Sequence, residues 1–132
     1  MSVPSQHARK NWRSKFANAV RGLVVGVRGH SSFAVHFPVA ACVIVAGAVL
    51  RVSLIEWCLL AGCITAVLAA EMFNSGLESL AKAIDVEHNL HLGDALDIGS
   101  AAVLVAAIGA AVVGGTVLLF RLGVLLAWWP AA

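Results

Sequence analysis

Three long apolar stretches dominate the pattern of hydrophobic and polar positions in this chain. They cover residues 33–50, 52–81 and 98–120, and the second becomes polar toward its end. An α-helix rises about 1.5 Å per residue, so about 20 apolar residues cross the hydrocarbon core of a bilayer. The pattern therefore predicts three transmembrane helices, of which the second continues into the cytoplasm. The first carries no formal charge, although His36 lies near its start.

A further helix is predicted ahead of these spans, over residues 10–30. Its apolar side chains recur at spacings of three and four and therefore share one face. They are Phe16, Val20, Leu23 and Val27. Arg and Lys occupy much of the remaining surface, which is typical of an amphipathic helix lying in the membrane interface. Packing of this helix against the bundle is an alternative that does not exclude the interfacial position.

The composition places the chain among integral membrane proteins. Of its 132 residues, 61% are apolar and only 12% are charged, whereas a soluble domain carries roughly 25% charged residues. A chain this short forms too small a globule to bury so much apolar surface. These values disfavour a soluble enzyme, a disordered tail and a nucleic-acid-binding domain. We expect one all-α membrane domain that covers residues 1–132.

The charges are unevenly distributed, although they sum to only +2. Six of the nine basic residues lie within the first 28 positions, and no acidic residue precedes Glu56. By the positive-inside rule, the N-terminus is predicted to stay in the cytoplasm. The short turn at Arg51 then lies outside, as does the C-terminus, where Trp128 and Trp129 suit an aromatic belt.

Cysteine and histidine give no strong disulfide or zinc signal. The three cysteines lie within apolar runs and lack a C-x-x-C spacing, which indicates small buried thiols that fill packing gaps. They are Cys42, Cys58 and Cys63. The spacing of His88 and His91 suits zinc, but no cysteine lies near them, so a zinc site is disfavoured.

The most informative polar residues lie where the second span meets the cytoplasm. They are Glu71, Asn74, Ser75 and Glu78. Their offsets of three, four and seven residues place them on one helix face, within an arc of about 100°. Carboxylate and carboxamide oxygens on one face suit Mg²⁺ together with substrate phosphates. One carboxylate could instead act as a general base toward a hydroxyl group delivered from the bilayer.

Less specific interpretations of these acids also exist. The two glutamates could simply mark a helix end that meets water, and Asp97 could cap the third helix or complete a metal and nucleotide site. A small proton-coupled transporter with Glu71 as its carrier group is a further alternative. It is disfavoured because Glu71 lies at the end of a span, whereas transport sites tend toward the middle of the bilayer.

Two motifs together resemble those of the prokaryotic diacylglycerol kinase family, which includes the undecaprenol kinases. The first is E-x-x-N-S-G-L-E over residues 71–78, and the second is D-I-G-S-A-A-V-L from Asp97. The resemblance extends over most of the chain. It implies a homotrimeric kinase of the bacterial inner membrane that transfers the γ-phosphoryl group of MgATP to a lipid alcohol such as diacylglycerol, in contact with the bilayer and not with nucleic acid.

The resemblance also assigns roles to individual residues. Glu71 would be the general base, Asn74 and Glu78 would serve Mg²⁺ and phosphate, and Asp97 would help to organise ATP. The family usually has a metal-binding Glu where this chain has His30, which makes His30 a further candidate for the metal site.

Two other positions depart from the family pattern. Leu96 replaces a phosphate-binding Lys, and Lys82 replaces an Asp. Arg28 or Lys82 could supply the missing positive charge. Two alternatives stay open: an undecaprenol kinase, because the apolar side chains do not identify the lipid alcohol, or, because of His30 and Leu96, a family member with impaired catalysis that acts as a lipid-binding or assembly component of the membrane.

Overall fold

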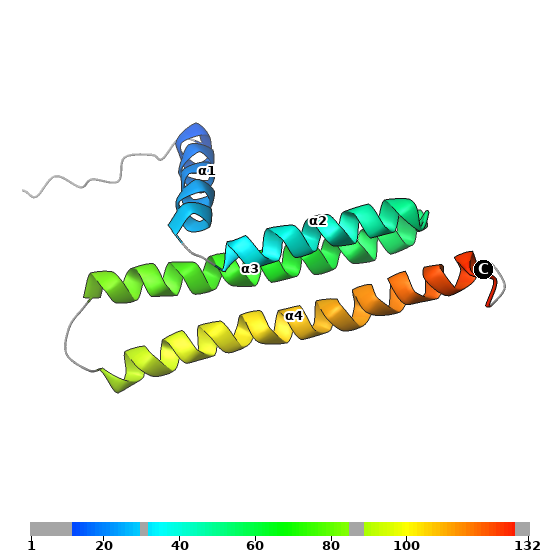
Figure 1. Cartoon of the computed structure of the whole chain (residues 1–132). Coiled ribbons are helices and arrows are strands. Elements are labelled where there is room, and N and C mark those ends of the chain that lie inside the picture. Colours follow the sequence, from blue (N-terminus) through cyan, green and yellow to red (C-terminus); the bar gives the residue numbers. More distant parts are fainter. Residues whose placement is uncertain (1–11, 30–31, 85–88, 129–132) are drawn as a thin grey trace, which may run out of the picture.

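The chain folds into long helices. The computed structural model describes residues 12–29, 32–84 and 89–128, and helices are the regular elements of this part of the chain. They are α1 (Trp12–Gly29), α2 (Phe33–Val49), α3 (Leu54–Ile84) and α4 (Leu90–Leu125). The predicted all-α fold is thereby confirmed. Helices α2, α3 and α4 run alongside one another, whereas α1 stands apart at their side (Figure 1).

The two longest helices confirm the membrane character of the protein. Both α3, with 31 residues, and α4, with 36 residues, are long and apolar enough to cross a bilayer. Helix α2 has 17 residues, and it counts toward a third span when it is joined to α1, from which it turns by 103°. The described residues thus provide two or three candidate spans, where the sequence predicts three.

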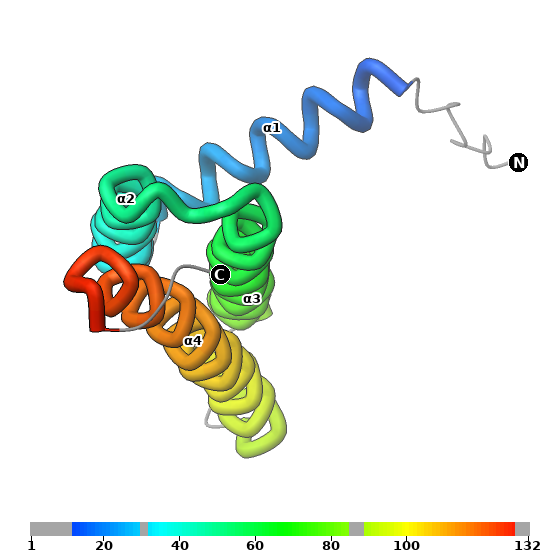
Figure 2. Tube along the Cα trace, turned by 90° about the vertical axis from the view of Figure 1, so that its right-hand side faces the viewer, coloured from blue at the N-terminus to red at the C-terminus, as the bar shows by residue number. Residues whose placement is uncertain are grey.

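The apolar side chains of these helices point mostly outward. In the most apolar 18-residue stretch of α3 only 11% is buried, and in that of α4 only 6% is buried. Such a surface is stable when lipid or further subunits cover it, as in a membrane protein. Figure 2 shows α2, α3 and α4 around a shared interior, with α1 leading away from them.

The interior is formed mainly where α3 packs against α4. Leu60 and Val67 of α3 are buried there, opposite glycines of α4. A Cβ atom at Gly114 would lie 3.7 Å from Leu60 Cδ2, and one at Gly99 would lie 3.0 Å from Leu77 Cδ1. Small residues at these positions let the two helix backbones approach closely, as is common between helices in lipid.

A tight turn connects α2 to α3. The Val52 N–H donates to the Gly47 carbonyl at 3.1 Å, and the Arg51 N–H donates to the Ala48 carbonyl at 3.3 Å. These are the two hydrogen bonds of a Schellman motif, with Arg51 at φ 53° in the left-handed position that ends a helix. Val52 is buried behind the turn. The two helices are therefore held as an antiparallel pair.

The start of α4 corrects one expectation. Its N-cap is Asn89, whose side chain accepts hydrogen bonds from the N–H groups of His91, at 3.0 Å, and Leu92, at 3.3 Å. The helix therefore begins at Leu90 rather than near residue 98, and it continues to Leu125 instead of residue 120. The possibility that Asp97 caps this helix is wrong, because Asp97 already lies two turns inside it.

Candidate active site

The polar face at the end of α3 points into the molecule. Glu71 is 2% exposed, Asn74 is 6% exposed and Ser75 is 2% exposed, whereas Phe73, between them in sequence, is 79% exposed. Helical periodicity explains the alternation, because residues three or four apart share a face and a residue at an offset of two does not. The three polar side chains lie where α3 meets its neighbours, and Phe73 points outward. The prediction that these residues share one helix face is confirmed, and the structure shows that this face is buried.

Asn74 connects this face both to Glu78 and to α4. Its Nδ2 donates a hydrogen bond to Glu78 Oε1 at 3.1 Å. Its Oδ1 is turned toward Gly99, where a Cβ atom would lie only 2.6 Å away. This oxygen is buried and has no hydrogen-bond partner among the described residues. An unpaired buried acceptor costs about 1–3 kcal/mol, so this oxygen is a candidate partner for a ligand.

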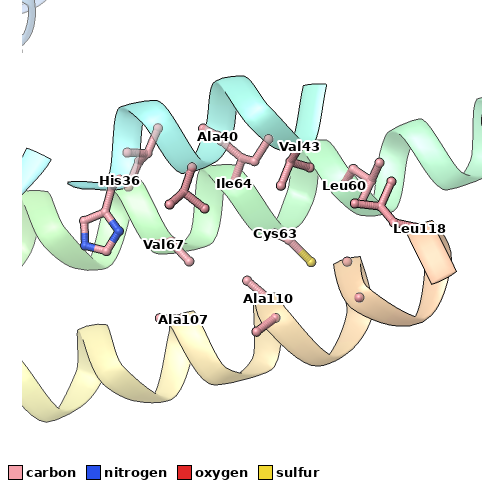
Figure 3. A pocket seen from close by; sticks show the side chains of 15 residues that line it. His36, Ala40, Val43, Leu60, Cys63, Ile64, Val67, Ala107, Ala110 and Leu118 are labelled. Carbon is pink, nitrogen blue, oxygen red and sulfur yellow. The ribbon is translucent and has the colours of Figure 1, made fainter. Parts of the chain in front are cut away.

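Glu71 faces α2 rather than the other acids. Its Oε2 lies 3.8 Å from His36 Nε2. His36 also lies at one end of a cavity of about 190 Å³ between α2, α3 and α4, which is otherwise lined mainly by aliphatic side chains. Figure 3 shows the His36 ring at that end, beyond Val67 and Ala107.

Ser75 lies on the side of α3 that faces α1. It lines a groove of about 730 Å³ together with Met72 and Ser79 of α3 and with apolar residues of α1. Its Oγ is buried and has no hydrogen-bond partner among the described residues. The α1 backbone comes close to this region, because a Cβ atom at Gly26 would lie 2.8 Å from the end of the Met72 side chain. The groove thus joins the surface helix to the polar face.

Several predicted site residues are not gathered on this face. Asp97 is exposed, and an offset of two residues places it on nearly the opposite side of α4 from Gly99, which faces Asn74. Lys82 and Arg28 are exposed near the ends of α3 and α1. His30 lies outside the described residues. Within the described ranges, no group of three or more His, Cys, Asp or Glu side chains could hold a metal ion.

His36 belongs to this region, beside Glu71 and at the end of the cavity, although it lies outside the two motifs of the sequence. A signal was available, because an ionisable side chain inside an apolar span is rare and is often functional. Its partner could not be read from the pattern, since Glu71 lies on another helix 35 positions further along the chain.

Comparisons with known proteins agree with the resemblance of the motifs. The family model of the prokaryotic diacylglycerol kinases matches residues 17–118. The matched region begins inside α1 and ends inside α4, so it includes the entire polar face and Asp97. Searches of curated proteins and of solved structures found no match.

Proposed function

Because the chain belongs to the prokaryotic diacylglycerol kinase family, we propose that it transfers the γ-phosphoryl group of MgATP to a lipid alcohol such as diacylglycerol. The family is one of lipid kinases, and the helices of the chain are those of a membrane protein. The observation that supports the proposal best is the buried face of Glu71, Asn74 and Ser75 at the end of a candidate span. Carboxylates at that place can meet a lipid hydroxyl and a nucleotide at once.

Glu71 is the proposed general base. Its carboxylate would take the proton of the lipid hydroxyl while that oxygen forms a bond to the γ-phosphorus. The bond between the γ-phosphorus and the oxygen that bridges to the β-phosphorus breaks, and ADP leaves. Such a reaction depends on positioning and electrostatic stabilisation. The burial of Glu71 supports this role, because water is kept away from the transferred group.

Glu78 and Asn74 are the proposed Mg²⁺ ligands. Both present hard oxygen atoms, and Asn74 Oδ1 is a buried acceptor without a hydrogen-bond partner among the described residues. This donor set fits Mg²⁺, which usually keeps several waters and phosphate oxygens beside one or two protein carboxylates. When bound, Mg²⁺ neutralises negative charge on the transferring phosphoryl group. His30, which lies outside the described residues, is the further proposed ligand.

Asp97 is proposed to organise ATP within a homotrimer of the bacterial inner membrane. It is exposed and faces away from Asn74 of its own chain, so its carboxylate is accessible to an adjacent copy. The N-terminus is proposed to lie in the cytoplasm, in keeping with the basic residues that precede the spans. On this side of the membrane the polar end of α3 meets ATP.

The proposal is tested by a phosphate-transfer assay on purified protein. The protein is incubated with Mg²⁺ and γ-labelled ATP, and with diacylglycerol, undecaprenol or a simple long-chain alcohol in mixed micelles. Label in the phosphorylated lipid supports the kinase, and the preferred acceptor identifies its substrate. Labelling of undecaprenol above diacylglycerol would make the chain an undecaprenol kinase.

A protein that binds lipid without catalysis is the second candidate. It is favoured by one observation: Leu96, half-buried in α4, occupies the position at which the family pattern has a phosphate-binding Lys. Losing that positive charge weakens the stabilisation of a transferring phosphoryl group. Absence of lipid phosphate from a well-folded sample, with every acceptor tested, would favour this candidate.

A further inference from the structure

The ionisable side chain that meets Glu71 is His36, across the interface between α2 and α3. The Nε2 of His36 lies 3.8 Å from Glu71 Oε2. The Glu71 side chain is 3% exposed and the His36 side chain is 19% exposed, so the pair is largely removed from solvent. The separation exceeds a normal hydrogen bond by about 1 Å. A small side-chain movement closes it.

The packing of α2 directs His36 inward. Phe33, one turn earlier, is buried, and Ala40 and Val43, one and two turns later, line the same cavity as His36. These spacings of three and four define one inner face of α2. The His36 N–H also donates to the Ser32 carbonyl at 3.3 Å, which holds its backbone in the first turn of the helix. The imidazole therefore faces the other helices instead of lipid (Figure 3).

A buried carboxylate loses its hydration, and protein donors have to replace it. The nearby amide of Asn74 does not provide this for Glu71, because its Nδ2 donates to Glu78. Among the described residues, the ion-pair partner of Glu71 is His36. An imidazole carries one or two N–H donors, depending on its protonation. It can therefore hold one carboxylate oxygen by a hydrogen bond in either state.

We propose that His36 is a positioning residue for Glu71. An imidazole N–H holds Oε2, and Oε1 is left free to accept the proton of the lipid hydroxyl. His36 does not touch the reacting atoms and acts through the orientation of the carboxylate. The inference rests on the proposed function, because the orientation of Glu71 matters only if Glu71 is the base.

Two substitutions separate hydrogen bonding from packing. His36→Met and His36→Gln introduce side chains of similar length, and only Gln ends in an amide that can donate. We expect H36M to lower kcat by about 10- to 100-fold, the usual effect of losing a residue that orients a catalytic group. The KM values for lipid and MgATP should change by less than about threefold, because ground-state binding is unaffected. H36Q should retain kcat within about fivefold of the wild type.

A matched control on the same helix is Val43→Ala. Val43 lines the same cavity two helical turns beyond His36 and is not the ion-pair partner of Glu71, so V43A should leave kcat close to that of the wild type. Each variant is first checked for a single symmetrical peak in detergent size-exclusion chromatography. His36→Leu replaces H36M as the variant without a donor if H36M does not fold. Equal losses in H36M and H36Q, or a loss in V43A as large as that in H36M, would overturn the positioning role.

The same assay separates this inference from the kinase proposal. If H36M acts through the base, the double variant E71Q/H36M should be no slower than E71Q alone, since residues that act as a unit are not additive. An active wild type, an inactive E71Q and an H36M variant with normal kcat would refute the role of His36 alone. An inactive wild type would refute the kinase proposal, and the role of His36 with it.

Discussion

Two acidic side chains of helix α3, Glu56 in its first turn and Glu71 in its second half, differ in how their charge is satisfied. Glu56 accepts hydrogen bonds from Arg121 Nε at 2.8 Å to both carboxylate oxygens, from Arg121 Nη2, and from the Ser53 N–H at 2.6 Å. Glu71 has His36 at 3.8 Å. A carboxylate has about four acceptor positions. Four donor contacts reach the Glu56 carboxylate, three at Oε2 and one at Oε1, whereas the described surroundings of Glu71 leave more acceptor capacity free.

This difference separates a structural acid from the proposed general base. The Glu56 carboxylate joins α3 to α4 through Arg121, and with Ser53 it forms a capping box at the start of α3. Its oxygens are committed to these contacts. The other end of the interface combines a buried carboxylate, an unpaired amide oxygen and an unpaired hydroxyl among the described residues. Unpaired buried groups lower the local stability of the fold. A ligand that supplies the missing contacts restores this stability when it binds.

The largest effect is expected from Glu71→Gln. Removing a general base lowers turnover by about 10²- to 10⁴-fold, and the amide has nearly the same shape, so insertion and folding should persist. The measurement is kcat in the lipid phosphate assay. The matched control is Glu56→Gln, which alters another acid of α3 and should leave kcat per folded molecule near the wild-type value. A wild-type turnover in E71Q would end the assignment of the base.

The next largest effect is expected from Glu78→Gln. Loss of one carboxylate ligand should raise the Mg²⁺ concentration needed for half-maximal activity by about 10- to 100-fold. Excess Mg²⁺ should restore much of the activity in E78Q but not in E71Q, because Glu78 is proposed to bind the metal and Glu71 is not. Titration with Mg²⁺ after removal of free metal by a chelator measures this. An unchanged Mg²⁺ dependence in E78Q would contradict the ligand assignment.

A smaller effect on activity is expected from Gly99→Ala. The added methyl group would lie 2.6 Å from Asn74 Oδ1, so Asn74 has to move and its hydrogen bond to Glu78 is disturbed. We expect kcat/KM to fall by about tenfold, since misplacing a positioning group by about 1 Å costs up to 10²-fold. Gly109→Ala is the control in the same helix, because nothing lies within 4 Å of its new Cβ atom. Equal activity of the two variants would show that this close approach does not matter.

The smallest effect on turnover, and a visible one on stability, is expected at the other end of α3. Glu56→Gln and Arg121→Gln each leave a partner without its counter-charge, which should lower the midpoint of thermal unfolding in detergent by several degrees. The double variant should have a midpoint of unfolding at least as high as that of the less stable single variant, because no unpaired charge is left when both are removed. Activity at low temperature should stay near the wild-type value. A loss of kcat without a loss of stability would make Glu56 part of the active site.

The sequence contains enough information to predict the polar face but not its surroundings. Glu71, Asn74 and Ser75 belong to one helix, and their common face follows from the helical period alone. The ion pair of Glu56 and Arg121 joins residues 65 positions apart, and no periodicity relates them. Asn89 is a residue type that favours the N-cap position, but the apolar run that predicts the helix begins nine residues later. The structure gives it the capping role considered for Asp97.

What the sequence determined by itself is the class of the protein and the chemistry that is available: apolar helices for a membrane, one basic amphipathic helix, and acids, an amide and a hydroxyl at one end of a span. These properties follow from transfer free energies and from spacing within a helix, which are local. Only the tertiary structure decided that His36 meets Glu71 and that Gly99 faces Asn74. It also decided that Asp97 lies on the exposed side of α4, away from Asn74. Contacts between helices depend on their relative rotation, and a shift of one residue turns a side chain by about 100°. The spacing of residues within one helix does not fix this rotation, which is set when the helices pack against one another.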